Sequence, residues 1–292
     1  MAQLEVQKPV RKLRVESGRS VAHRVLMDVI AILIAVIFLF PLYWILISSF
    51  KTDVEIFDKN ISFWPRNFTF SPWITQLTDS DFLYSLRNSF VIAALNMAFS
   101  TIFGATAAYG LARFKFPFKK ALLLLFLVTQ MMPGSLLLTP LYLMFSGAKM
   151  LNTYQAPVLA IATGSILFIV VTLRPFFLSL PKSLDEAARI DGCNAFTSFI
   201  RIMIPIARVG LVTCLVFCFL HGWNDLVYSM TFNVKAEMRP LTANIYKFMD
   251  KYGTKWNQIM AYGMILVIPV ILIFVCLQKY IVGGLTSGAV KE

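Results

Sequence analysis

Long runs of apolar residues, separated by short polar segments, make up most of this sequence. Several runs continue for about 20 residues or more without a charge, enough for a helix to cross a bilayer core roughly 30 Å thick. A helix on the surface of a soluble protein would interrupt such runs with polar residues at every turn. The pattern therefore predicts an all-α integral membrane protein with six transmembrane helices. The predicted spans are residues 29–47, 87–113, 120–149, 150–173, 208–228 and 256–277.

Composition and charge support a membrane protein and predict its orientation. The chain of 292 residues is 58% hydrophobic and has a mean hydropathy of +0.71, far above the values of soluble domains. Basic residues are concentrated in residues 1–24 and 113–120 (RFKFPFKK), which the positive-inside rule places in the cytoplasm. Six crossings then return the C-terminus to the cytoplasm. The net charge of +12 therefore reflects topology, and no nucleic-acid partner is predicted, because such binding needs bases gathered on one folded face.

The spans and the polar segments between them divide the chain into regions. We predict a cytoplasmic tail (1–24), a first transmembrane helix (25–50), an extracytoplasmic segment (51–84), a transmembrane core (85–282) that contains a loop at 181–205, and a cytoplasmic C-terminal tail (283–292).

Few residues are of a kind that carries catalysis or binds a metal. The four cysteines have no C-x-x-C spacing and there are only two histidines, so no metal site is predicted. The phosphate-binding pattern G-x-x-x-x-G-K-[ST] is absent, so the chain is not expected to bind ATP. Titratable groups are nearly absent from the spans, and protease and hydrolase motifs are missing. These observations disfavour an ion-coupled transporter and an intramembrane enzyme.

The loop 181–205 carries charges that a lipid-facing helix would not tolerate. Ser183 and Glu186 have the spacing of a capping box, which predicts a short helix from Leu184. Gly192 suits the left-handed position that ends a helix. A second short helix is predicted over 194–202, with Pro205 opening the fifth span. The alternative is a pair of amphipathic helices lying on the membrane, which the acidic residues of the loop disfavour.

Several segments resemble the permease subunits of ABC importers. The loop reads E-A-A-x-x-x-G followed by I-x-P, as in the EAA loop of that family. MMPGSLLLTPLYLMF, the tripeptide WND at 223–225 and the ending QKYIVGGLTSGAVKE resemble the second permease subunit of maltose-type carbohydrate importers. The resemblance covers roughly residues 25–292 and implies the type I ABC importer permease fold.

The resemblance also implies a set of partners and a location. It implies a heterodimer with a second permease subunit, two ATP-binding subunits that hold ATP and Mg, and an extracytoplasmic solute-binding protein that delivers a sugar. The location implied is the bacterial cytoplasmic (inner) membrane. Two alternatives stay open: the same architecture importing an acidic oligosaccharide or a non-sugar solute, and a membrane scaffold or receptor subunit that does not transport.

Candidate functional residues fall into four groups. Contact with the ATP-binding subunits is expected from Glu186, Ala187, Ala188, Asp191, Gly192 and Pro205 of the loop, and from Gly284, Leu285, Thr286 and Gly288 of the C-terminal tail. The long outer loop 233–255 is expected to touch the binding protein through Arg239, Asn244 and Tyr246, or else to lie on the outer leaflet. Trp223 and Asn224 are candidates for the substrate path.

Overall fold

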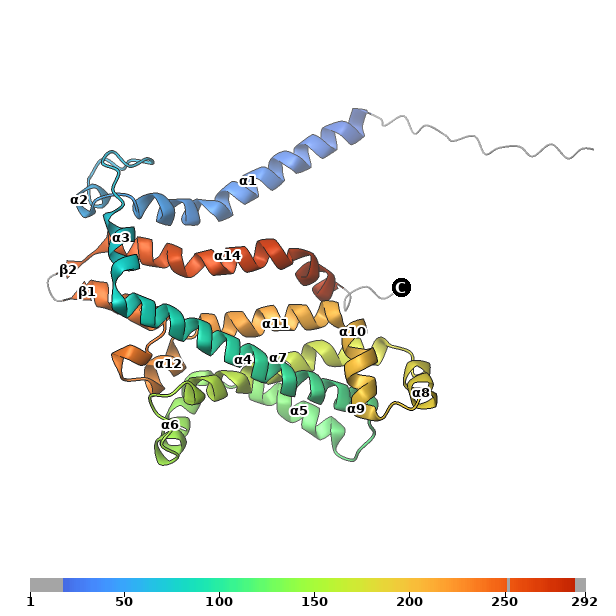
Figure 1. The fold of residues 1–292 in the computed structure, drawn as a ribbon. Helices are drawn as coiled ribbons and strands as arrows, with labels where there is room; N and C mark the ends of the chain where they lie inside the picture. Colours follow the sequence, from blue (N-terminus) through green and yellow to red (C-terminus); the bar gives the residue numbers. More distant parts are fainter. Residues whose placement is uncertain (1–17, 251–252, 287–292) are drawn as a thin grey trace, which may run out of the picture.

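Helices form almost all of the structure. The computed structural model describes residues 18–250 and 253–286. The five longest helices are α1 (Gly18–Ser48), α4 (Ser80–Arg113), α7 (Gln155–Ser179), α11 (Arg208–Trp223) and α14 (Trp256–Thr286), and they run along a common direction (Figure 1). Four helices are long and apolar enough to cross a membrane, or up to six spans if each of two bent helix pairs counts as one. The all-α membrane architecture is confirmed, and six spans is the upper count.

Helices α4, α7 and α11 form the centre of the bundle because small residues let them approach closely. A side chain at Gly104 of α4 would place its Cβ 2.7 Å from the Cβ of Ile169 on α7. A side chain at Gly222 of α11 would lie 2.7 Å from the Cα of Ala93 on α4. Gly104 and Gly222 are therefore packing residues, which allow α4 to approach α7 and α11 closely.

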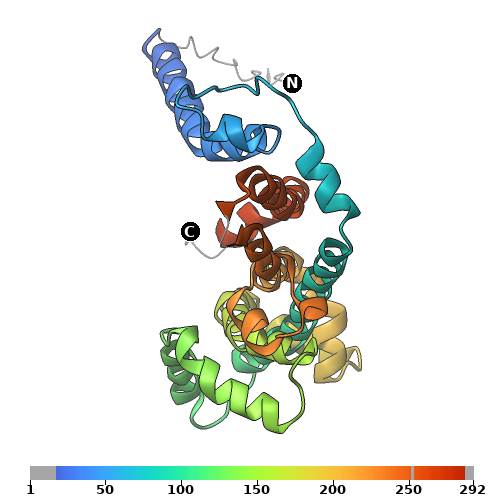
Figure 2. The ribbon, with the colours of Figure 1, turned by 90° about the vertical axis from the view of Figure 1, so that its left-hand side faces the viewer.

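Helix α1 stands at one edge of the molecule. None of the side chains in its most apolar window is buried, and its contacts are with α14. Viewed along the bundle, α1 lies at one edge and α5 (Lys119–Gln130) and α6 (Leu138–Gly147) at the opposite edge (Figure 2). The apolar surface of α1 is available to lipid or to a partner helix.

The predicted third span is broken. Helix α5 ends at Gln130, a turn follows, and the 3₁₀ helix η1 (Gly134–Leu137) leads into α6 at an angle of 99° to α5. Pro133 starts η1 with an extended backbone, which ends the helical hydrogen bonding there. The predicted fourth span begins five residues late, at Gln155, because Asn152 adopts a left-handed turn and donates its backbone N–H to Phe232.

Short elements gather at the two ends of the bundle. We call the end with α8 the loop end and the opposite end the far end (Figure 1). The loop end carries α8 (Ser183–Ile190), α9 (Ala195–Ser198), the π-helix η2 (Phe199–Met203) and α10 (Ile204–Ile206). The far end carries α2 (Asp53–Ile56), α3 (Ser71–Thr78), α12 (Val227–Phe232), η3 (Ala236–Met238), α13 (Leu241–Asn244), η4 (Ile245–Phe248) and the antiparallel strands β1 (Met249–Asp250) and β2 (Gly253–Thr254), in which Met249 pairs with Thr254.

Candidate functional site: the charged loop between α7 and α11

Helix α8 begins without the predicted capping box. Its first residue is Ser183 and its N-cap is Lys182, whose side chain makes no capping hydrogen bond. The Lys182 carbonyl accepts from the backbone N–H groups of Asp185 and Glu186, 3.0 and 3.2 Å away. The side chain of Glu186 is exposed rather than folded back on the helix start. The capping-box prediction is wrong because Ser183 lies inside the first turn, one position too late to cap it.

Gly192 ends α8 as predicted. Its φ is +79°, in the left-handed region. The backbone N–H of Cys193 donates to Ala188 over 2.8 Å and that of Gly192 donates to Arg189 over 3.0 Å. These two bonds are the pattern of a Schellman motif, which satisfies the last carbonyls of a helix. The turn after α8 is therefore fixed by backbone geometry at one glycine.

The second half of the loop is a bent helix. Asn194 caps α9 by accepting from the backbone N–H of Thr197 at 2.8 Å, close to the predicted start. Helical structure then continues through η2 and α10 to Ile206. After Ala207 the chain turns by 87° into α11. Pro205 therefore lies in the last loop helix, and the prediction that it opens the fifth span is wrong, since that span begins at Arg208.

One face of α8 packs against the bundle and another is exposed. Leu184 and Ala188 face the bundle, with Ala188 only 1% exposed. Glu186, Ala187 and Ile190 face outward, with Ile190 87% exposed. Ala188 was predicted to contact a partner, but its side chain is buried within this chain. Its small side chain instead lets α8 lie close against the bundle.

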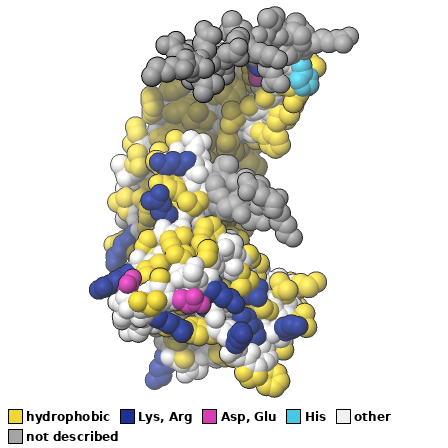
Figure 3. All heavy atoms as spheres, turned by 90° about the vertical axis from the view of Figure 1, so that its right-hand side faces the viewer, with side chains coloured by type: hydrophobic (Ala, Val, Ile, Leu, Met, Phe, Trp, Pro, Cys, Tyr) yellow, Lys and Arg dark blue, Asp and Glu magenta, His cyan; other side chains and the backbone are white. Residues whose placement is uncertain are grey.

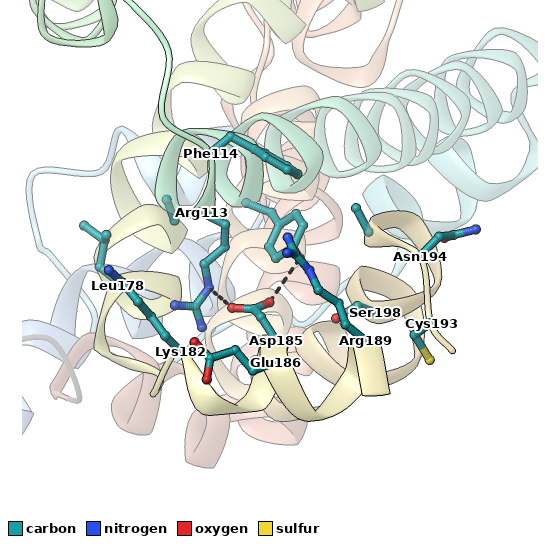
Figure 4. A pocket seen from close by; sticks show the side chains of 13 residues that line it. Arg113, Phe114, Leu178, Lys182, Asp185, Glu186, Arg189, Cys193, Asn194 and Ser198 are labelled. Carbon is teal, nitrogen blue, oxygen red and sulfur yellow. Dashed lines mark hydrogen bonds and ion pairs between the residues drawn. The ribbon is translucent and has the colours of Figure 1, made fainter. Parts of the chain in front are cut away.

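One partly buried ion pair attaches α8 to α4. The Nε of Arg113, the last residue of α4, lies 3.1 Å from the Oδ2 of Asp185, and only 9% of the Arg113 side chain is exposed. Arg113 Nη1 donates to the Leu180 carbonyl at 3.1 Å, and the Tyr109 hydroxyl donates to Asp185 Oδ1 at 3.3 Å. Figure 4 shows the Asp185 carboxylate pointing away from the outer face of α8 and into this cluster. The sequence analysis assigned no role to any of these residues.

A cavity of about 270 Å³ lies between α8, α9 and the end of α4. Its walls mix charged and apolar groups, and Figure 4 shows Arg113, Asp185 and Glu186 among the side chains that line it. The lining includes Phe114, Leu178, Lys182, Glu186, Arg189 and Asn194. Basic, acidic and apolar side chains all contribute to the lining of this cavity. Such a mixed lining does not form an enclosed polar site for a small molecule. The arrangement suits contact with a protein surface.

Exposed apolar residues occupy the tip of the loop. Ile190 is 87%, Phe196 71% and Ile200 47% exposed. Lysine and arginine side chains are spread over the loop-end face, with few acids among them and apolar side chains between them (Figure 3). An apolar centre with a charged rim is the composition of a protein-binding surface. Asp191 and Gly192 are exposed beside it.

The far-end loop is folded back on the bundle. The Asn244 side chain donates to Ser85 Oγ on α4 at 2.8 Å, and Arg239 Nη2 donates to the Val234 carbonyl at 3.1 Å. Tyr246 is 50% exposed. Of the three residues predicted to contact a binding protein, Tyr246 alone presents most of its side chain outward.

Lys247 ties the same loop to the start of α4. It forms an ion pair and hydrogen bond with Asp79, the N-cap of α4. Burial raises the pKa of the Asp79 carboxyl, but the bond from Lys247 and those from the backbone N–H groups of Asp81 and Phe82 outweigh it and hold the pKa below its usual value. The charged carboxylate of Asp79 thus holds the far-end loop to α4 through Lys247.

The remaining candidates differ in accessibility. Trp223 is 1% exposed and its indole N–H donates to the Leu266 carbonyl at 3.1 Å, so its side chain stabilises the bundle and does not line a path. Asn224 is exposed. Helix α14 continues through Gly284, Leu285 and Thr286, where a flexible tail was predicted, and Gly288 lies outside the described residues.

Metal chemistry has no support in the part of the chain that the structure describes. Within it, no group of three or more His, Cys, Asp or Glu side chains could hold an ion. Cys214 and Cys218 are buried among apolar side chains of the α4–α7–α11 core. They are packing residues of this core.

Known proteins match the chain along most of its length. Residues 100–287 match the family described as "Binding-protein-dependent transport system inner membrane component". The diacetylchitobiose uptake system permease protein DasC of Streptomyces coelicolor is 30% identical over 94% of this chain and 99% of its own length. The probable ABC transporter permease protein YurM of Bacillus subtilis is 36% identical over 86% and 83%.

A solved structure shows the same fold. One chain of a bacterial ABC transporter involved in the import of the acidic polysaccharide alginate superposes with a TM-score of 0.78 and 21% identity, over 90% of this chain and 98% of that one. The type I permease fold is therefore confirmed. The family match and the relatives of 30% identity or more establish that this chain belongs to the binding-protein-dependent transport system inner membrane components, the membrane permeases of ABC importers.

Proposed function

We propose that this chain imports a sugar or oligosaccharide, forming the path with a second permease subunit and taking its energy from two ATP-binding subunits. The observation that carries the proposal is the outer face of the loop. Glu186, Ala187 and Ile190 project from a helix fixed by Gly192, at the very end of the bundle. This surface fits docking of a protein partner, and the ATP and Mg would be held there by the partner.

The distribution of charge supports an orientation. Bases dominate the loop end, and the start of α1 and the end of α14 lie at the same end (Figure 1). Under the positive-inside rule this is the cytoplasmic end. We therefore place both termini in the cytoplasm and the far end outside, where a solute-binding protein would dock near Tyr246. The bases concerned are Arg113, Lys115, Lys119, Lys120, Arg174, Lys182, Arg189, Arg201, Arg208 and Lys279.

Relatives support a carbohydrate substrate. The names of three matching permeases refer to diacetylchitobiose, to arabinooligosaccharides and to trehalose. Asn224 is exposed at the end of α11 and is the polar candidate left for the path. An acidic oligosaccharide is the second candidate, because the alginate importer shares the fold. Two bases of the far-end loop, Arg239 and Lys247, are already bonded within the chain, which favours a neutral sugar.

Reconstitution tests the proposal. The chain, its second permease and the ATP-binding subunits are placed in liposomes, the binding protein is added, and uptake of labelled neutral and uronic acid oligosaccharides is measured with and without ATP. We expect uptake of a neutral sugar that requires ATP and the binding protein. Assembly of the complex without any ATP-driven uptake would indicate a scaffold and contradict the proposal. Uptake of uronic acid oligomers alone would favour the second candidate.

A further inference from the structure

Helix α4 is the longest helix in the described residues and connects the two ends of the molecule. Its 34 residues extend for about 51 Å at 1.5 Å per residue. It contains no proline, whereas α1, α7 and α14 carry Pro41, Pro175 and Pro269. It also packs against both α7 and α11 in the centre of the bundle. A displacement at one end of such a helix reaches the other end with little bending.

At the far end, α4 holds the loop 236–244 by buried polar side chains on one of its faces. Asn88 Nδ2 donates to the carbonyls of Glu237 and Arg239, at 2.7 and 3.1 Å. Ser89 Oγ accepts from the backbone N–H of Leu241 at 2.8 Å. The Asn244 side chain donates to Ser85 Oγ at 2.8 Å. The serines of this face are fully buried and Asn88 is 2% exposed, so water does not compete for these bonds.

At the loop end, α4 holds α8 by the pair Arg113–Asp185. The carboxylate of Asp185 points toward Arg113 and Tyr109, whereas Glu186, the next residue, points about 100° further around α8 and is exposed. Leu184 and Ala188 add apolar contacts, which are less directional than an ion pair supported by the hydrogen bonds of Arg113 Nη1 and the Tyr109 hydroxyl. Within the part of the chain that the structure describes, Asp185 is the acidic partner of Arg113.

We propose that Arg113 and Asp185 form a latch that makes α4 a rod between the two ends, so that a change at the far-end loop is transmitted to the docking helix α8. Both are positioning residues, which act by fixing α8 on α4. The inference rests on the proposed function, since it assumes a binding protein at the far end and ATP-binding subunits at the loop end.

The test uses the complete complex in liposomes and measures how strongly the ligand-loaded binding protein stimulates ATP hydrolysis. The variants are Asp185→Asn, which preserves size, Arg113→Gln, their double variant and Ser85→Ala/Ser89→Ala at the far end. The matched control is Asp58→Asn, which breaks another Arg–Asp pair, Arg66–Asp58 at 2.9 Å, on the exposed surface of the far end.

We expect assembly and unstimulated hydrolysis to stay normal in all variants. Stimulation should fall by about fivefold or more in the latch and far-end variants, within the range typical of coupling between sites. The double variant should lose no more stimulation than either single variant, because each single substitution already removes the one interaction that the two residues share. Arg113→Lys should retain most of the stimulation, and Asp58→Asn all of it.

Other outcomes overturn the inference. Unchanged stimulation in Asp185→Asn and Arg113→Gln, or losses that multiply in the double variant, would show that the pair is no latch. If Arg113→Gln does not assemble, the test rests on hydrogen exchange in Asp185→Asn. The inference requires faster exchange in α8 and unchanged exchange in α4, and unchanged exchange in α8 would overturn it. A wild-type complex without ATP-driven uptake would overturn the proposed function itself, whereas normal wild-type uptake with unaffected variants overturns the latch alone.

Discussion

Substitution of Gly192 measures how much one backbone conformation contributes to the stability of the turn after α8. A Cβ at this position meets no atom within 4 Å, so Gly192→Ala introduces no clash. The whole effect comes from φ +79°, a conformation that disfavours a residue with a Cβ by about 1–2 kcal/mol. That strain opposes the Schellman bonds, including the one from the Cys193 N–H to Ala188.

The expected result is faster hydrogen exchange at the Cys193 amide. A penalty of about 1–2 kcal/mol raises the open population of the turn by about 5- to 30-fold, and exchange accelerates by the same factor. Gly192→Asn should have a smaller effect than Gly192→Ala, because Asn tolerates the left-handed region, and Gly192→Val a larger one. Transport should decrease in the same order.

Gly110→Ala is the matched control. Gly110 also has open space around its missing Cβ, but it lies within α4 with ordinary helical backbone. Alanine is favoured over glycine there by about 1 kcal/mol. Exchange at Cys193 should stay at the wild-type rate in this variant. Equal protection of Cys193 in Gly192→Ala and wild type, or a larger effect of Asn than of Val, would refute the account of the turn.

Three further predictions concern the bundle and its far end. Trp223→Ala should lower the melting temperature of the detergent-solubilised protein strongly, since it removes a buried side chain worth about 3–5 kcal/mol, while Asn224→Ala should leave it unchanged and alter uptake instead. Gly222→Ala should destabilise by about 1–3 kcal/mol in the same assay because its Cβ would press on the α4 backbone. Asn244→Ala should destabilise the protein by about 0.5–1.5 kcal/mol through its lost hydrogen bond. Tyr246→Ala should leave stability unchanged and weaken the affinity for the binding protein, measured by titration. The reverse pattern would contradict the far-end assignment.

The features that sequence predicted well depend on local physics. Apolar run length is a property of the chain itself, so the helices near 29–47 and 256–277 lie where they were predicted. The role of Gly192 follows from the conformation that ends a helix, for which glycine is the favoured residue. The resemblance of the loop to a family motif is confirmed by the family match.

The features that sequence predicted wrongly depend on packing. Ser183 and Glu186 have capping-box spacing, but the chain leaving α7 brings Lys182 to the N-cap and starts α8 one residue earlier. Ala187 and Ala188 are the same residue type, so the sequence does not show which of them is buried. The position of α8 against the bundle decides that Ala188 faces inward. Pro205 is compatible with a helix start, yet the chain bends after Ala207.

The latch was missed because its partners are distant in sequence. Arg113 was interpreted only as a cytoplasmic base at the end of a span. One signal was present: Asp185 and Glu186 are adjacent on a short helix, and neighbouring helical positions face different directions. The two acids therefore point in different directions, and they have different surroundings once α8 lies against the bundle. The sequence alone did not indicate which of the nearby bases Asp185 would meet.

Cross-linking from the loop tip tests the central claim, that this chain is driven by ATP-binding subunits docked on the loop. A photoreactive amino acid replaces Ile190 or Phe196, which are 87% and 71% exposed, in the complete complex, and Ile61 at the far end, 70% exposed, is the matched control. Irradiation should attach positions 190 and 196, but not 61, to an ATP-binding subunit, with yields that change when ATP is trapped. Active complexes that give no such product at 190 or 196 would contradict the claim.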